Sequence, residues 1–394
     1  MPTVQPLKQG WGVYIHIPFC RSKCAYCDFY SHGASEQERR EYAQAVIRHI
    51  AGEADKWDGA HGPTTVFFGG GTPSLLPPES GRAILKQIRH TFGDHLLSEV
   101  TIEANPGTVT GPDLLQWVRG GCNRLSLGVQ AFQPRLLAFL GRKHSLEDVR
   151  GAVTAAKQAG LSNVNLDLIY GIPGQSMEDW RLSLELALDL EPAHLSLYNL
   201  KPEAGTPLAL WLERGLTGVC PEDLEVEMYE EARRLLHLAG FRQYELSNFA
   251  RPGWECRHNL NYWHRGDYLG FGSSAASGVG LRRWTWAADS RQYVRALSSG
   301  CDVPIGDDEM LTPVVAAEEA VMLGLRLTKG VNLQEVLRRY GLGERQGSCW
   351  HKLSTILHGK GWVDYDGSRV KLMPESYLVA NEIMEKYLGE ESEN

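Results

Sequence analysis

Three cysteines, Cys20, Cys24 and Cys27, are spaced four and three residues apart just after the alternating apolar run 13–17. Thiolates this close in sequence can converge on a metal, but three of them leave one tetrahedral position without a protein ligand. A structural zinc site would need a fourth cysteine or histidine nearby, whereas an iron–sulfur cluster on three thiolates keeps one iron free for a small molecule. The spacing therefore favours an iron–sulfur cluster, with an incomplete zinc site and plain reduced cysteines as the alternatives.

Composition narrows the class of protein. The chain has 394 residues, a net charge of −8 and eight cysteines, of which three are bunched. The length predicts two domains, one of them large. The acidic balance argues against a nucleic-acid or anionic-membrane partner, because either would favour a basic face. The cysteine pattern indicates a reducing compartment rather than a disulfide scaffold, and the scattered Cys122, Cys220, Cys301 and Cys349 are interpreted as ordinary thiols.

Hydropathy adds a prediction about location. No apolar run approaches the ~20 residues that a membrane-spanning helix needs, and the first strand is expected within about a dozen residues without an apolar signal core. We therefore expect a cytoplasmic protein with no membrane span.

Strands and helices alternate along the first 240 residues. Apolar and β-branched runs predict strands at 13–17, 64–68, 99–104, 124–129, 163–170 and 194–199. Helices are expected at 35–57, between the glycine loop and about residue 92, at 114–119, at 145–159 and from 176 onward. A capping box at residues 35–38 marks the start of the first helix. Such alternation implies parallel pairing with right-handed crossovers. The predicted fold is α/β, a curved and partly open (β/α)6 barrel.

Polar groups follow or end several of these predicted strands. In such barrels the chemistry sits at the carboxyl ends of the strands, where the connecting loops gather. The cysteine loop follows the first strand and Gly69-Gly70-Gly71 the second, while Glu103, Gln130 and Asp167 fall at the third, fourth and fifth. A buried parallel strand would otherwise stay apolar. Each group alone could be a loop cap or a satisfied polar contact, but together they predict a ligand site at one rim.

The C-x3-C-x2-C spacing resembles the signature of the radical S-adenosylmethionine (SAM) superfamily. The resemblance to its branch containing oxygen-independent coproporphyrinogen III dehydrogenase (HemN) covers essentially the whole chain. It implies a 4Fe-4S cluster on the three cysteines, with the amine and carboxylate of SAM on the open iron. The residues that match the family's SAM-binding pattern are Tyr14, Tyr26, Gly70, Gly71, Thr72, Glu103, Gln130, Arg142 and Asp167.

These residue types suit the implied ligand. Glycines permit close approach without a Cβ clash, and carboxylates suit ribose hydroxyls or an ammonium group. The planar guanidinium of Arg142 can pair with a carboxylate, and Tyr26 is expected to offer its main chain to the adenine.

A second stretch, residues 254–264, holds Cys256, His258 and Tyr262 among aromatic residues. His, Tyr and Cys are all axial ligands of haem iron, and aromatic faces can cover a porphyrin. Aromatic clusters are more often core, however, and a single histidine is more often structural. The sequence His258-Asn259-x-x-Tyr262 matches the H-N-x-x-Y motif of the HemW-like haem chaperones, and this resemblance implies His258 as the first candidate haem ligand, followed by Tyr262 and Cys256.

The resemblance implies one of two functions. The first is a haem chaperone that carries haem as cargo to an acceptor protein, and the alternative is an oxygen-independent coproporphyrinogen III dehydrogenase. Phe29 stands where the decarboxylating relatives carry a further cysteine, too few residues precede Tyr14 for their N-terminal substrate segment, and the H-N-x-x-Y motif is present. These features favour the chaperone. A cluster-bearing structural or regulatory protein without haem is the third hypothesis.

Some properties are left open by the sequence. It assigns no catalytic residue and does not decide whether SAM is cleaved. It is compatible with a homodimer.

The rest of the chain is expected to divide after the core barrel of residues 1–240. A helix at 221–240 and a strand at 243–246 lead into a connecting region, 241–305, that carries the haem motif. Its small-residue loop 270–278 either admits a flat macrocycle or is a plain turn. A HemN-like C-terminal domain, 306–385, and a tail, 386–394, complete the chain.

The C-terminal domain is expected to resemble a winged helix. Helices are predicted at 313–325, 333–340 and 346–357, followed by a hairpin of strands 362–365 and 370–372 with a type I′ turn signal at Asp366-Gly367. The segment lacks the basic stripe that DNA reading requires, so a packing or lid role is expected.

Overall fold

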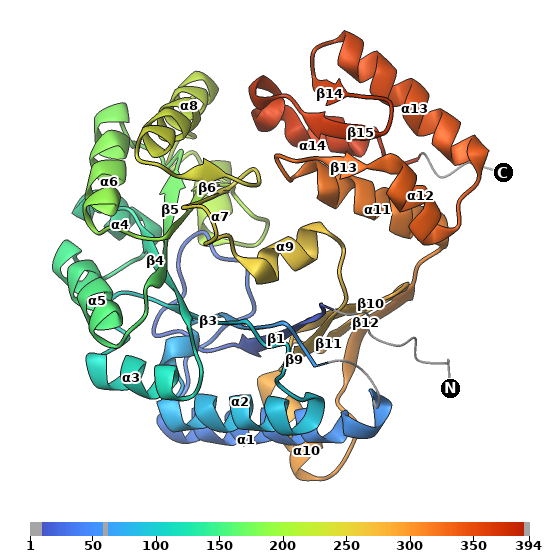
Figure 1. Cartoon of the computed structure of the whole chain (residues 1–394). Helices are drawn as coiled ribbons and strands as arrows, with labels where there is room; N and C mark the ends of the chain where they lie inside the picture. Colours follow the sequence, from blue (N-terminus) through green and yellow to red (C-terminus); the bar gives the residue numbers. More distant parts are fainter. Residues whose placement is uncertain (1–9, 58–61, 390–394) are drawn as a thin grey trace.

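The structure is a computed structural model that describes residues 10–57 and 62–389 (Figure 1). The segment predicted before the first strand occupies residues 1–9 and lies outside the described residues. Most of the predicted tail, at 390–394, lies outside them as well. None of the described helices is long and apolar enough to cross a membrane.

A curved sheet of twelve strands in the order β12-β11-β10-β9-β1-β2-β3-β4-β5-β6-β8-β7 forms the centre of the molecule. Strands β1 to β6 run parallel in sequence order. Within the described residues β12 and β7 are the two free edges, so the barrel is open, as predicted. The strands are β1 Gly12–Ile17, β2 Thr65–Gly70, β3 Glu99–Ala104, β4 Arg124–Gln130, β5 Asn163–Tyr170, β6 His194–Asn199, β7 Arg242–Gln243, β8 Asn248–Ala250, β9 Tyr268–Phe271, β10 Ala276–Val279, β11 Arg282–Trp286 and β12 Ile305–Met310.

Most of the helices cover the outer face of this sheet (Figure 1). The helices pack there because alternate residues of each strand point to opposite faces, and the outward ones are apolar. In β1, Val13, Ile15 and Ile17 are fully buried in the main core, whereas Tyr14 and His16 line cavities on the inner face. The helices of this part of the chain are α1 Glu36–Gly52, α2 Pro78–Phe92, α3 Gly111–Arg119, α4 Pro134–Leu140, α5 Leu146–Gln158, α6 Met177–Asp189, α7 Pro207–Glu213, α8 Glu222–Leu238, α9 Arg257–Trp263 and α10 Ser290–Ser298.

Local signals fix the starts of several helices. Ser35, Ser145 and Ser176 each accept a hydrogen bond from the backbone N–H three residues on, and an acidic side chain at that position bonds back to the cap. These reciprocal capping boxes satisfy donors that a helix start otherwise leaves open. The predicted helix starts are therefore confirmed at these positions.

The structure differs from the predictions where pairing is set by distant parts of the chain. The strand expected at 243–246 is instead split into β7 and β8, which pair antiparallel with each other, and β8 pairs with β6. Strand β9 pairs parallel with β1 and extends the parallel run beyond the six predicted strands. Residues 270–278 comprise the end of β9, the connection 272–275 and most of β10, which supports the interpretation of a plain turn between strands.

The C-terminal part packs around a second hydrophobic core (Figure 1). Its three-stranded sheet has the order β13-β15-β14, and the predicted hairpin is confirmed as an antiparallel pair. The predicted type I′ turn is wrong, because Gly367 has a positive φ of 97° but Asp366 does not. The elements are α11 Pro313–Leu325, β13 Val331–Asn332, α12 Leu333–Tyr340, α13 Glu344–Gly359, β14 Val363–Tyr365, β15 Arg369–Leu372 and α14 Ala380–Glu385.

The two cores do not by themselves fix the domain limits. Strand β12 pairs with β11 in the large sheet, and the second core begins with α11. The boundaries after residues 240 and 305 stay predictions.

Gly81 in α2 gives a test of how the barrel's outer helices pack. A Cβ at this position would overlap the indole of Trp117 in α3. We predict that Gly81→Ala lowers the free energy of unfolding by about 1–3 kcal/mol because the buried contact is overpacked, measured by urea unfolding. The control is Gly151→Ala in α5, where a Cβ would meet nothing within 4 Å; it should be stabilising by about 0.5–1 kcal/mol. A neutral Gly81→Ala would contradict this packing.

Candidate functional site

A cavity of about 590 Å³ opens at the carboxyl ends of the parallel strands. It brings together the groups that the sequence places at this rim. Its lining includes every predicted cluster and SAM residue except Thr72, namely Tyr14, Cys20, Cys24, Tyr26, Cys27, Gly70, Gly71, Glu103, Gln130, Arg142 and Asp167.

Backbone hydrogen bonds hold the cysteine loop over this rim. The Cys20 N–H donates to the His32 carbonyl (3.0 Å), and the Ala25 N–H donates to the Leu140 carbonyl at the end of α4 (3.1 Å). The Thr72 N–H donates to the Phe19 carbonyl (2.8 Å), which ties the glycine loop to the cysteine loop. All three thiols are half-buried, and burial raises the pKa of the Cys27 thiol, with the neighbouring Cys24 and Cys20 adding to the rise.

The guanidinium of Arg142 organises the polar side chains beneath the loop. One terminal nitrogen, Nη1, lies 3.7 Å from Cys24 Sγ and donates to Asn105 Oδ1 at 2.9 Å, while Nη2 donates to the Gly128 carbonyl at 2.7 Å. Asn105 in turn donates to Thr72 Oγ1 (3.0 Å). That hydroxyl lies 3.6 Å from Cys20 Sγ, so one network reaches two of the three thiols.

The donors at this site are three thiols and a guanidinium group. Within the described residues no group of three His, Cys, Asp or Glu side chains is placed to hold one metal ion. A cubane differs because its thiolates bind different irons. Arg142 Nε is buried and has no hydrogen-bond partner in the described part of the chain. The Arg142 side chain lines the cavity, and a guanidinium group pairs well with a ligand carboxylate.

Two carboxyl groups and a phenol lie deeper in the cavity. Burial and the nearby Asp167 raise the pKa of Glu103 to about 8. Burial also raises the pKa of Asp167, which accepts hydrogen bonds from Asn165 (2.8 Å) and Ser126 (3.1 Å). The pKa of Tyr14 is raised well above its ordinary value by burial and by Glu103. The site therefore holds carboxyl groups that favour a partner with donor groups or positive charge.

Backbone geometry explains why small residues stand here. A Cβ on Gly70 would lie 2.5 Å from the His16 ring, and one on Gly71 would lie 2.7 Å from the Phe19 carbonyl. Both glycines are thus required by contacts within the protein. Gln130 is a non-glycine residue with a φ of 67°, next to a register shift in β4. Strain of this kind concentrates at functional sites.

Sequence reasoning missed several lining residues. Asn105, which connects Arg142 to Thr72, lies two residues after Glu103, so its amide could have been noticed. Arg124 is 2% exposed, and its Nε has no partner among the described residues; a buried arginine at a strand start gives no sequence signal. The other missed polar side chains are Ser126, Asn165, Ser196, Tyr198, Asn199, Lys201, Glu203 and Asn259.

The H-N-x-x-Y motif forms α9, which lies at the opposite, amino-terminal end of the strands, near the middle of the molecule (Figure 1). His258 is 1% exposed. Its Nδ1 lies 2.8 Å from Thr65 Oγ1 and its Nε2 lies 2.9 Å from the Tyr262 hydroxyl, because residues four apart share one helix face. Burial and the charge of Arg124 lower the pKa of His258 to about 3, so this imidazole is neutral.

Glu99 at the start of β3 fixes the beginning of α9. Its carboxylate accepts hydrogen bonds from the N–H groups of Arg257 (2.9 Å) and His258 (3.0 Å) and from the Cys256 thiol (3.5 Å). Cys256 is fully buried, and burial raises the pKa of its thiol to about 12. Of the three predicted haem candidates, Cys256 is thus held as a buried thiol and His258 uses both nitrogens internally. The half-buried Tyr262 lines a second cavity of about 590 Å³, to which β1, β9, β10 and α11 also contribute.

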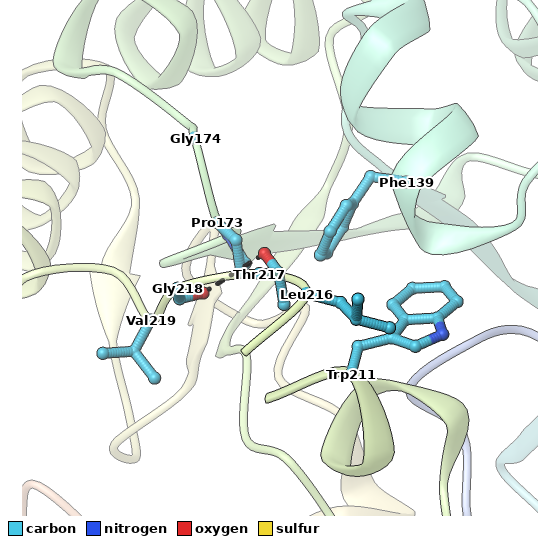
Figure 2. A pocket seen from close by; sticks show the side chains of 8 residues that line it. All are labelled: Phe139, Pro173, Gly174, Trp211, Leu216, Thr217, Gly218 and Val219. Carbon is cyan, nitrogen blue, oxygen red and sulfur yellow. Dashed lines mark hydrogen bonds between the residues drawn. The ribbon is translucent and has the colours of Figure 1, made fainter. Parts of the chain in front are cut away.

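Another hollow, between α4 and α7, carries no such chemistry. Figure 2 shows its lining, which consists of Phe139, Pro173, Gly174, Trp211, Leu216, Thr217, Gly218 and Val219. None of these side chains is ionisable.

Comparison with known proteins defines the class of this chain. The family described as the radical SAM superfamily matches residues 14–187. The solved structure of Escherichia coli coproporphyrinogen III oxidase (HemN), described as a radical SAM enzyme, shares the fold with a TM-score of 0.82 and 22% sequence identity, covering 96% of this chain and 90% of that one. The fold is therefore that of a radical SAM protein.

Curated relatives narrow this class. The chain is similar to the heme chaperone HemW of a Synechocystis species, at 41% identity over 81% of this chain and 79% of the relative. It is also similar to the heme chaperone HemW of Mycobacterium tuberculosis, at 36% identity over 99% of this chain and 98% of the relative. The chain belongs to the HemW family, and the family resemblance seen in the sequence is confirmed.

Glu103 gives a test of the electrostatics of the cavity. Its carboxyl has a pKa of about 8 in the folded chain against an ordinary 4.5, so the folded state binds the proton more tightly. The free energy of unfolding should therefore fall as pH rises from about 5 to 8. We predict that Glu103→Gln removes part of this fall in cluster-free protein, measured by urea unfolding across pH. The exposed Glu178→Gln is the control. Equal slopes in wild type and Glu103→Gln would contradict the assignment.

Proposed function

We propose that this protein is a haem chaperone that carries a 4Fe-4S cluster on Cys20, Cys24 and Cys27, with SAM as the exchangeable ligand of the open iron. The observation that carries the cluster and SAM proposal is the single cavity lined by all three thiols and the polar groups of five strands. Membership of the HemW family supports the proposed chaperone role. Haem is then the cargo, and the partner is a haem-accepting protein.

The chain's own groups suit the bound cofactor in distinct ways. Arg142, whose side chain lines the cavity, would pair with the methionine carboxylate, and Glu103 and Asp167 would bind the ammonium group or the ribose hydroxyls. Tyr26 would offer its main chain to the adenine from the cysteine loop. When bound and reduced, the cluster and SAM supply radical chemistry at this rim. Gly70, Gly71, Thr72, Gln130 and Tyr14 would shape the pocket around them.

The state of the cysteines supports a reducing compartment. All eight cysteines lie in the described residues and all are free thiols. We therefore propose a cytoplasmic location, where an exposed cluster can be loaded and kept reduced. A homodimer is proposed as an assembly to test, and light scattering of the loaded protein decides it.

Cluster binding can be tested with matched cysteine variants. We predict that Cys24→Ala, reconstituted anaerobically with iron and sulfide, loses most of the about four irons per chain expected of a cubane, because one of three thiolate ligands is gone. The exposed Cys301→Ala, remote from the cavity, should retain them. The measurement is iron and sulfide content together with the visible absorption. If Cys24→Ala retains a full complement of iron, the ligand assignment is wrong.

Haem binding separates the chaperone from the other hypotheses. We predict a stoichiometric Soret shift when haemin at micromolar concentration is added to wild-type protein, weakened in His258→Ala because that change removes the hydrogen-bond partner of Tyr262. An unchanged spectrum would favour a cluster protein without haem. A parallel anaerobic incubation with reductant, SAM and coproporphyrinogen III should give no protoporphyrinogen; its catalytic formation would instead establish the dehydrogenase.

A further inference from the structure

The floor of the first cavity, the one lined by the three thiols, holds a buried cation. Arg124 is the first residue of β4, and it is 2% exposed yet lines this cavity. Its Nε has no hydrogen-bond partner, and its guanidinium forms no ion pair with a carboxylate, in the described part of the chain. A cation is costly to bury without a counter-ion or a full set of hydrogen bonds. This side chain is therefore suited to receive an acceptor group from a ligand.

The acidic groups around Arg124 do not neutralise it by contact. Glu99 and Asp167 act on its charge only over a distance, because each carboxyl group is held by other donors. Glu99 accepts the N–H groups at the start of α9, and Asp167 accepts hydrogen bonds from two neighbouring side chains. Thr101, the register partner of Arg124 on β3, is also fully buried, and its hydroxyl has no partner among the described residues. Two adjacent polar groups at one level of the sheet therefore have donors to offer.

Arg124 lies well below the place proposed for the amino-acid end of SAM. Arg142 is anchored at that place by its hydrogen bond to the carbonyl of Gly128, which follows Arg124 by four residues on β4. At about 3.3 Å per residue in a parallel strand, the two levels are roughly 13 Å apart. One carboxylate cannot reach both arginines, so the floor is a separate subsite.

The side chains around the floor indicate the shape of its ligand. Tyr14 and Phe67 stand at the same strand level as Arg124, and both line the cavity. Their rings supply an apolar wall beside the guanidinium. Asn259 reaches the cavity from α9, which lies at the amino-terminal end of the strands, and its amide can donate a second hydrogen bond. A small molecule with one acceptor end and a compact apolar body fits this arrangement.

The charges around the floor favour a ligand with a single negative charge. Glu103 is the register partner of Ser126, two residues above Arg124 on β4, and Asp167 lines the same space. Burial and Asp167 raise the pKa of Glu103 to about 8, so its carboxyl group is largely protonated at neutral pH. Acidic groups this close disfavour a dianion such as phosphate. A monocarboxylate therefore fits the floor better.

We propose that the floor of the first cavity binds the carboxylate of a small organic monoacid, with Arg124 as the residue that recognises it. The carboxylate accepts hydrogen bonds from the guanidinium group, and the apolar body of the acid lies against Tyr14 and Phe67. Binding involves no covalent step. The inference goes beyond the haem chaperone function and does not depend on haem binding.

The experiment is isothermal titration calorimetry of reconstituted, full-length protein at neutral pH with acetate and with benzoate, two monoacids of different size. Benzamide, which has the shape of benzoate without its charge, and inorganic phosphate are the control ligands. Wild type should bind at least one of the two monoacids, and should bind benzamide and phosphate more weakly than that acid.

Matched variants locate the bound acid. Arg124→Met keeps the length of the side chain but removes its charge, and should lower the affinity for the acid roughly ten- to hundredfold. The exposed Arg150→Met on α5 should leave the affinity unchanged. Arg142→Met removes the other guanidinium group discussed above and should still bind the acid at the floor. Because no carboxylate pairs with Arg124 by contact, Arg124→Met should unfold at the same urea concentration as wild type or a higher one.

Each result decides the inference. Loss of acid binding in a folded Arg124→Met, with Arg150→Met and Arg142→Met unaffected, supports it, as does weaker binding in Asn259→Leu. The inference is wrong if wild type binds neither monoacid, if Arg124→Met binds the acid as wild type does, if only Arg142→Met loses it, or if phosphate binds more tightly.

A stability measurement gives one further way to overturn the inference. A large loss of stability in Arg124→Met would make Arg124 a structural counter-charge for Glu99 and Asp167 rather than a ligand-binding residue. Iron content and haemin binding are measured separately on the same proteins. Failure of the acid to bind therefore leaves the proposed function standing, and failure of haemin to bind leaves this inference standing.

Discussion

The contact on which the rest of the site depends is the guanidinium of Arg142 beneath the cysteine loop. It reaches Cys24 Sγ, Asn105 and the Gly128 carbonyl at once, and thereby joins the loop after β1 to the ends of β3 and β4. Because a guanidinium group is planar and its N–H donors point in fixed directions, it can hold several acceptors in one geometry. Gly128 is part of the same constraint, because a Cβ there would lie 2.6 Å from Arg142 Nη2.

The two ends of the open barrel are built for different tasks. The carboxyl ends of the strands carry thiols, carboxyl groups and a strained Gln130 around an accessible cavity. The amino-terminal ends are closed by α9, whose first N–H groups are held by Glu99 and whose neutral His258 bonds to Thr65. Asn259 of the same helix lines the first cavity and Tyr262 lines the second. The H-N-x-x-Y motif therefore contributes a lining residue to each of the two cavities.

The sequence predicted best what local patterns decide. Strands β3, β5 and β6 and helices α11 and α12 have the bounds expected from their apolar periodicity, and the serine caps start their helices as predicted. The convergence of the cysteines with Glu103 and Asp167 was predictable because parallel strands bring their carboxyl ends to one rim. The pairing of β9 with β1 and the burial of Cys256 were not predictable, since both depend on contacts between residues far apart in sequence.

Functional detail was hardest to predict where a residue type has two uses. His258 has the identity of a haem ligand, yet its two nitrogens bond to Thr65 and Tyr262, which only the tertiary structure shows. Arg124 gave no periodic signal, because a single buried arginine looks the same in sequence as an exposed one. The two adjoining cavities likewise depend on how α9 and α11 pack against the inner face of the sheet.

The central claim is that three thiolates hold a cluster whose fourth iron is left for SAM. Electron–nuclear double resonance of the reduced, reconstituted protein with SAM labelled by ¹⁵N at its amine and ¹⁷O at its carboxylate tests it most directly. The account predicts hyperfine coupling from both labels to the cluster, lost when unlabelled SAM is added in excess. A cluster signal without coupling from either label would contradict it.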